Sequence, residues 1–125
     1  YGDEAGLTGI LEDEYRQPMP WDTLDENSPL FLLYQKAIAL RKAEPVLRKG
    51  EYRTLLAQPG SRLYGYERYP VTEDEGTERI RIFLNMESRT VEIPQEMLRG
   101  EILWQEGLTE GQLVAKGFAL IRTRD

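Results

Sequence analysis

Cysteine and histidine are both absent from the sequence, and these two absences exclude much of the common chemistry of enzyme sites. Without cysteine there are no disulfides, thiol nucleophiles or thiolate metal ligands. Without histidine the commonest general base and the usual zinc ligand are missing. Acid–base chemistry would have to use carboxylates, lysine or tyrosine, and we expect neither a metal site nor a cofactor. The lack of cysteine is compatible with a reducing cytoplasm, which is the location we expect.

Long apolar runs and a basic stripe are absent as well. No run approaches the roughly 20 apolar residues that span a bilayer. The formal net charge is −6, and no Lys/Arg stripe is available to contact phosphates. We therefore expect neither a membrane nor a nucleic acid as a partner. The chain begins with Tyr1 rather than Met and has no signal sequence, so we expect its natural start to lie upstream.

What is present suits one compact domain with an appended element: 125 residues, 40% of them hydrophobic, with enough aromatic residues to fill a core. Residues 1–22 are rich in glycine, proline and acids, and Pro18 and Pro20 forbid a helix there. This stretch is predicted to be a long loop, and loops of such length inside compact proteins are often functional.

A single helix is predicted at about 29–43. Ser28 is a suitable N-cap, Pro29 suits the first helical position, and Pro45 ends the helix. Apolar residues recur at helical spacing and form one stripe: Leu30, Leu33, Tyr34, Ala37 and Ile38.

After Gly50 the apolar period changes to two, which indicates strands. In the clearest one, Ile80, Ile82, Leu84 and Met86 share one face, and arginines occupy the other. The predicted strands are Tyr52–Ala57, Leu63–Tyr69, Arg79–Met86, Thr90–Ile93, Glu101–Trp104, Gln112–Ala115 and Phe118–Thr123. Turn signals separate them, including Glu106-Gly107. Seven short strands favour a mainly β fold, an antiparallel β-sandwich, preceded by a loop and one α-helix.

Five segments in order resemble glycoside hydrolase family 13, the α-amylase superfamily, and within it the cyclomaltodextrinase, neopullulanase and maltogenic amylase group. The first two are Tyr1-Gly2-Asp3-Glu4-Ala5-Gly6-Leu7 and Arg16-Gln17-Pro18-Met19-Pro20-Trp21-Asp22, similar to the segment after the eighth barrel strand. Residues 33–50 resemble the last barrel helix and its exit. Leu63-Tyr64-Gly65-Tyr66-Glu67-Arg68 and Ile82-Phe83-Leu84-Asn85-Met86-Glu87-Ser88 are similar to strands of the C-terminal sandwich.

The resemblance implies a C-terminal fragment of a retaining α-glycosidase with a (β/α)₈ barrel. Residues 1–48 would be the end of the barrel and residues 49–125 the C-terminal sandwich, Greek-key in type. The nucleophile, the acid and a third aspartate of the family would lie upstream of Tyr1, so we expect no catalytic residue here and no activity of the chain alone. Its role would be to stabilise the barrel of an enzyme acting on an α-glucan or maltooligosaccharide. Two alternatives stay open: a carbohydrate-binding module and an oligomerisation domain.

Asp3 and Glu4 are candidate substrate-binding residues by family analogy, since the loop that holds them would lie beside the active site. Adjacent residues on an extended chain point to opposite sides, so the pair does not suit catalysis at one glycosidic bond. A purely structural turn is the competing interpretation.

Arg16 and Trp21 are the other candidates. Arg16 could donate to sugar hydroxyls and Trp21 could stack on a glucose ring. Alternatively, Arg16 pairs with Glu12 or Asp13, and Trp21 plugs the loop against the barrel wall.

Exposed apolar stripes drive association, so the helix stripe predicts that the chain self-associates through residues 1–48 if barrel strands do not cover it. Tyr64 and Tyr66 share a strand face and Tyr69 takes the other, which argues against a three-ring sugar platform. Glu73-Asp74-Glu75 lacks the spacing of a calcium loop and is predicted to be a solvated hairpin tip.

Overall fold

The computed structural model describes residues 1–72 and 76–124, without the side chain of Tyr15, so the acidic run at 73–75 lies outside the described residues. The chain forms two compact units, Tyr1–Glu44 and Pro45–Asp125. The division into domains at residues 48 and 49 stays a prediction. In the described part of the chain no helix is long and apolar enough to cross a membrane.

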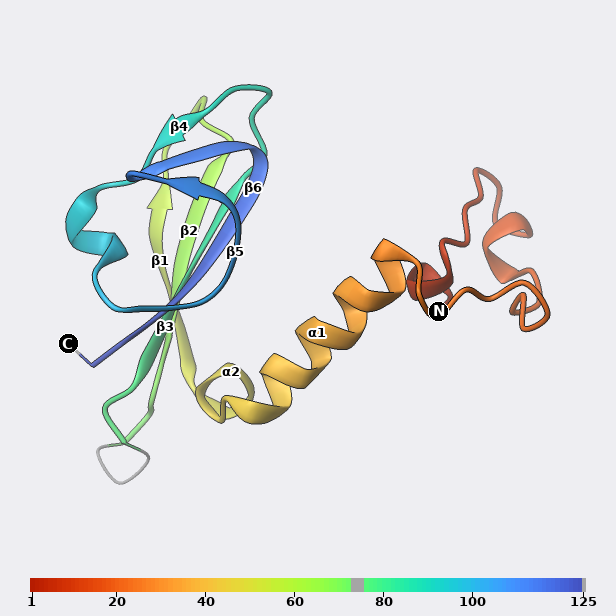
Figure 1. Cartoon of the computed structure of the whole chain (residues 1–125), viewed down its shortest axis with the longest axis horizontal. Helices are drawn as coiled ribbons and strands as arrows, with labels where there is room; N and C mark the ends of the chain where they lie inside the picture. The colour runs from red at the N-terminus through yellow and green to blue at the C-terminus, as the bar shows by residue number, and fades with distance from the viewer. Residues whose placement is uncertain (73–75, 125) are drawn as a thin grey trace. The chain divides into compact units, whose positions relative to one another are not determined.

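The first unit holds two short 3₁₀ turns, η1 (Asp3–Ala5) and η2 (Glu14–Arg16), and one helix, α1 (Pro29–Ala43) (Figure 1). The Ser28 hydroxyl accepts a hydrogen bond from the Phe31 N–H at 3.2 Å, Pro29 occupies the first turn, and Arg41 and Lys42 lie in the last. The predicted helix is confirmed at both ends because its cap and its stop are local signals.

In its described residues, the second unit is an antiparallel sheet with two short helices. Its elements are α2 (Val46–Lys49), β1 (Glu51–Ala57), β2 (Leu63–Tyr69), β3 (Arg79–Asn85), β4 (Val91–Glu92), η4 (Gln95–Leu98), β5 (Glu101–Thr109) and β6 (Gln112–Thr123). The strand order is β1-β2-β3-β6-β4, and β5 also pairs with β6. The long β5–β6 hairpin curves over the unit (Figure 1), so both layers are hydrogen-bonded through β6. The predicted fold class, a mainly β antiparallel sandwich preceded by a loop and a helix, is confirmed.

The prediction of two separate strands at 112–115 and 118–123 is wrong, because β6 runs unbroken through Lys116-Gly117. Lys116 has a φ of 61°, and the register with β5 shifts between Glu106 and Leu108. An irregularity of this kind bends a strand without ending it. The sheet therefore gains its curvature where the sequence indicated a break.

The turn predicted at Glu106-Gly107 is wrong too. Gly107, with a φ of 77°, lies inside β5, and the chain reverses at Glu110-Gly111, where φ is 49° and 84°. Two successive residues at positive φ fit the tight hairpin turn that matches strand twist. A Cβ at Gly107 would lie 2.1 Å from Val114 Cγ2, so close packing on β6 explains this glycine.

The core lies inside the curved sheet and contains Phe83, Ile93, Leu113 and Ile121. Strand β3 is covered on both faces, since Phe83 and Ile80 are each 0% exposed. The expected arginine face thus also carries core residues. Met86 lies beyond the end of β3 and is exposed, which corrects its place in the predicted apolar face.

Candidate functional site

Asp3 and Glu4 lie in the η1 turn, so the extended backbone assumed for them is wrong. Gly2 and Gly6 flank the turn with φ of 84° and 73°, and the Ala5 and Leu7 N–H groups both donate to the Gly2 carbonyl at 3.0 Å. The positive φ of Gly2 favours glycine, and a Cβ there would lie 2.2 Å from Leu7 Cδ1 unless that side chain moved. The Asp3 side chain is exposed, whereas Glu4 is half-buried and lines a groove along α1.

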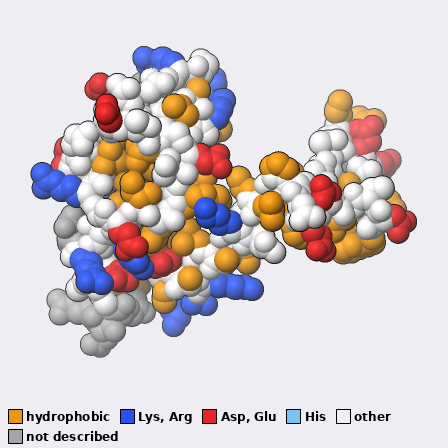
Figure 2. Space-filling view, in the orientation of Figure 1, with side chains coloured by type: hydrophobic (Ala, Val, Ile, Leu, Met, Phe, Trp, Pro, Cys, Tyr) orange, Lys and Arg blue, Asp and Glu red, His pale blue; other side chains and the backbone are white. Residues whose placement is uncertain are grey.

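The groove is open and has a volume of about 610 Å³. Apolar side chains of α1 form most of it, chiefly Phe31, Tyr34 and Ile38, and Lys42 and Glu4 also line it. Figure 2 shows apolar side chains at the surface of this helix and acidic ones in the preceding loop. The predicted stripe supplied Tyr34 and Ile38, but not Phe31.

Arg16 lies in η2 and forms an ion pair with Glu12 at 2.7 Å, one of the two alternatives predicted for it. The two side chains are 73% and 71% exposed, so the pair adds little to stability and leaves the guanidinium accessible. Trp21 is 72% exposed. Sugar contact by either residue stays a prediction.

Hydrogen bonds close the loop that carries these residues. The Gln17 amide donates to the carbonyls of Thr8 and Glu14 at 3.1 and 2.9 Å, and the Tyr1 hydroxyl donates to the Gln17 carbonyl. Within the described residues, no hydrogen bond or ion pair joins Asp3, Glu4, Arg16 and Trp21 to one another, and no acidic cluster suits a metal ion.

A row of three tyrosines crosses β1 and β2 on one face of the sheet. The ring centroids of Tyr52 and Tyr66 are 5.3 Å apart, and those of Tyr64 and Tyr66 are 5.7 Å apart. Tyr69 points to the other face, as its place in the strand predicted. Tyr52 could not be predicted as a member of this row, because only strand pairing brings it beside Tyr66.

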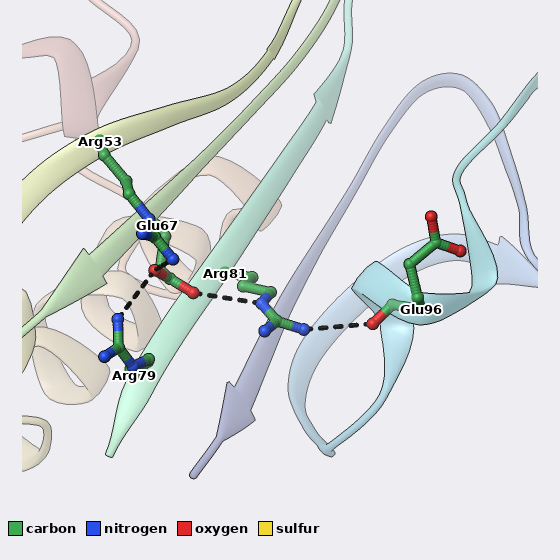
Figure 3. A network of polar contacts seen from close by, with 5 residues as sticks. All are labelled: Arg53, Glu67, Arg79, Arg81 and Glu96. Atoms are coloured by element: carbon green, nitrogen blue, oxygen red, sulfur yellow. Dashed lines mark hydrogen bonds and ion pairs between the residues drawn. The ribbon is translucent and has the colours of Figure 1, made fainter. Parts of the chain in front are cut away.

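The other face of the sheet carries an ion-pair cluster that the sequence analysis also missed, formed by Glu67 and three arginines (Figure 3). We call Arg53, Glu67, Arg79 and Arg81 the arginine cluster. Glu67 is 0% exposed; its Oε2 lies 2.8 Å from Arg53 and 3.3 Å from Arg79, and its Oε1 lies 3.2 Å from Arg81. Strand register explains the meeting, since Arg53 and Arg81 lie opposite Glu67 on either side.

Comparison with known proteins identifies relatives among amylolytic enzymes, although no family profile matches the chain. A cyclomaltodextrinase of Geobacillus thermopakistaniensis is 33% identical over 116 residues, which are 92% of this chain and 18% of that enzyme. Neopullulanase 2 of Thermoactinomyces vulgaris is 35% identical over 68 residues, 54% of this chain and 12% of the enzyme. Among solved structures, the maltogenic amylase of S. marinus matches 99% of this chain and 16% of its own, with a TM-score of 0.70 and 25% identity.

These matches confirm the resemblance to the cyclomaltodextrinase and neopullulanase group of glycoside hydrolase family 13. They also show that the chain spans less than a fifth of the length of the curated relatives it matches.

Proposed function

We propose that this chain is a non-catalytic part of a longer α-glucan-hydrolysing enzyme, in which it stabilises the catalytic barrel. The sandwich would cover one side of that barrel, and the first unit would contribute its last loop and helix. The substrate of the longer enzyme would be an α-glucan or maltooligosaccharide, as the names of the relatives suggest.

The observation that carries the proposal is the exposure of the apolar side chains of α1. Ten of its 15 residues are apolar, yet none of them is buried, in a helix that the structure describes in full. Leu30, Leu32, Leu33 and Ile38 are between 38% and 51% exposed. A helix that is apolar on several sides is normally surrounded by other protein. Covering these side chains would stabilise the longer enzyme by on the order of 1 kcal/mol each.

The candidate substrate residues fit the same role. Arg16 and Trp21 are exposed and carry the donor and the ring that sugar recognition uses, and Asp3 and Glu4 lie on a glycine-bounded turn. We expect them to shape the substrate cleft of the longer enzyme. By itself the chain lacks the carboxylate pair and should release no reducing sugar from cyclodextrin, starch or pullulan.

A segment exchange tests the proposal. This chain replaces the matching segment of the Geobacillus cyclomaltodextrinase, and cyclodextrin hydrolysis and the melting temperature are measured. We expect an active, folded enzyme, which loses several degrees of melting temperature when Leu33→Asp is introduced. The control is Lys36→Asp, at a polar helix residue that does not line the groove, which should change the melting temperature much less. An exchange enzyme indifferent to Leu33→Asp would contradict the role of α1.

The tyrosine row favours a second candidate, a carbohydrate-binding module. Tyr52 is 48% exposed, but the rings lean on one another, which leaves less of each ring face for a sugar. Calorimetry with maltooligosaccharides separates the two functions. Binding that Tyr64→Ala abolishes would establish the module.

A further inference from the structure

Among the residues that the structure describes, three guanidinium groups of the arginine cluster contact one buried carboxylate. One carboxylate, Glu67, faces three guanidinium groups, so the cluster has a formal charge of +2. This excess occurs in a chain whose net charge is −6. A single guanidinium would suffice to neutralise Glu67. Arg53 and Arg79 place two like charges against the same oxygen, Oε2.

The three arginines differ in how fully their donors are used. Arg81 is 13% exposed and donates to Glu67 and, at 3.3 Å, to the Glu96 carbonyl (Figure 3). Arg53 and Arg79 are 56% and 29% exposed. Among the described residues, their polar contacts are with Glu67 alone. Each guanidinium has five N–H donors, so the contact with Glu67 does not use all of them.

Arg53 and Arg79 are also held in place. Both contact the same Oε2 of Glu67, and each guanidinium carbon lies 5.6 Å from the centre of the Tyr69 ring. The shared oxygen and the shared ring hold the two charges close together, within reach of one tetrahedral anion. Little side-chain freedom would be lost when such an anion binds.

A hollow adjoins the cluster at Arg79. It has a volume of about 300 Å³, and its lining includes Arg124, Thr72 and Thr77. Among the described residues, the hollow beside Arg79 is thus lined by two threonines and by Arg124, which pairs with Glu78 at 3.1 Å.

We propose that Arg53 and Arg79 form a binding site for a phosphate group, free or carried by a sugar. A phosphate dianion accepts hydrogen bonds from two guanidinium forks at once. Glu67 and Tyr69 are positioning residues, which hold the forks but do not contact the anion. The site lies in the sandwich and does not depend on the role proposed for the whole chain.

The experiment uses the 125-residue chain and measures binding of inorganic phosphate and of glucose 6-phosphate by calorimetry. Melting temperatures in phosphate and in sodium chloride of equal ionic strength provide a second readout. We expect millimolar binding and a melting temperature that rises with phosphate beyond the chloride value. Arg53→Gln should weaken phosphate binding at least tenfold, whereas Arg62→Gln, at an exposed arginine outside the cluster, should leave it unchanged.

Arg53→Lys keeps the charge and loses the fork, so it should bind with intermediate affinity and serves as the test if Arg53→Gln is poorly folded. Tighter binding of glucose 6-phosphate than of phosphate assigns the site to a phosphosugar, and equal binding assigns it to free phosphate. No phosphate effect beyond that of chloride, or equal binding by the Arg53 and Arg62 variants, overturns the proposal.

Discussion

The side-chain amide of Asn85 donates a hydrogen bond to the main-chain carbonyl of Leu113 at 2.9 Å, joining residues 28 positions apart. The same nitrogen lies 2.8 Å from the Val114 carbonyl and 2.9 Å from that of Arg89, and the Asn85 carbonyl accepts from the Glu87 N–H. Asn85 is 0% exposed. It therefore ties the end of β3 to the start of β6, just before the irregularity at Lys116.

Substitution of Asn85 should strongly destabilise the sandwich. Asn85→Ala leaves buried carbonyls without donors, and we expect a loss of about 2–4 kcal/mol in the free energy of unfolding. Asn85→Asp should cost more, because it places a carboxylate against those carbonyls. Urea unfolding measures both. Asn27→Ala, at an exposed position, is the control and should change stability by less than about 0.5 kcal/mol. Equal stability of the Ala and Asp variants would contradict this assignment.

The sequence predicted those helices and strands whose ends are set by residues close by in the chain. The cap at Ser28 and the prolines bounded α1, and period-two alternation located β2 and β3. The continuity of β6 could not be predicted, because Lys116-Gly117 has the composition of a turn and only pairing with β5 keeps it in the strand. The partners of Asn85 lie too far along the chain for a periodicity argument.

The loop that carries the candidate residues was predicted from the sequence, but the groove along α1 was not. The groove depends on η1 lying beside α1, which brings Glu4 into the same lining as Phe31. One sequence signal was available, since Phe31 and Leu32 extend the apolar surface beyond the stripe. The arginine cluster required the register of three strands, because Arg53, Glu67 and Arg81 are unremarkable until they lie opposite one another.

Removal of the charge on Glu67 should destabilise the sheet. Glu67→Gln leaves three guanidinium groups without a buried counter-charge, and the expected loss is about 3–5 kcal/mol. The matched control is Glu101→Gln, which breaks an ion pair with Arg122 whose glutamate is 64% exposed, and which should cost at most about 1 kcal/mol. The free energies of unfolding of the two variants are compared by urea denaturation at low and at high sodium chloride concentration. Similar losses in the two variants would show that burial does not set the cost.

The loop of the first unit should respond to acid through Glu14. Its carboxylate accepts hydrogen bonds from the N–H groups of Leu11 at 3.0 Å and Ile10 at 2.6 Å, and these bonds, that of Leu11 first, hold the pKa of Glu14 below its ordinary value of 4.5. A lowered folded pKa means that the charged form stabilises the turn above the unfolded value and that this stabilisation is lost as pH falls through the folded value.

We therefore expect the amide resonances of Leu11 and Ile10 to shift together below pH 4.5 in NMR spectra, with faster hydrogen exchange. The Glu14→Gln variant should show no such transition in the spectra as the pH is lowered. The same acid transition in Glu14→Gln would assign it to another carboxylate.

Self-association of the chain is the expected consequence of an uncovered α1. Ile38 is 51% exposed and lines the groove with Phe31 and Tyr34, so a second copy can remove this apolar surface from water. We expect light scattering to show a mass that rises with concentration, and Ile38→Asp to return the chain to a monomer because a buried charge would oppose the contact. Lys36→Asp, also on α1, introduces the same side chain at a polar position and should leave association largely intact. A clean monomer at high concentration would contradict the prediction, and association abolished equally by both variants would indicate that net charge, rather than the apolar groove, controls it.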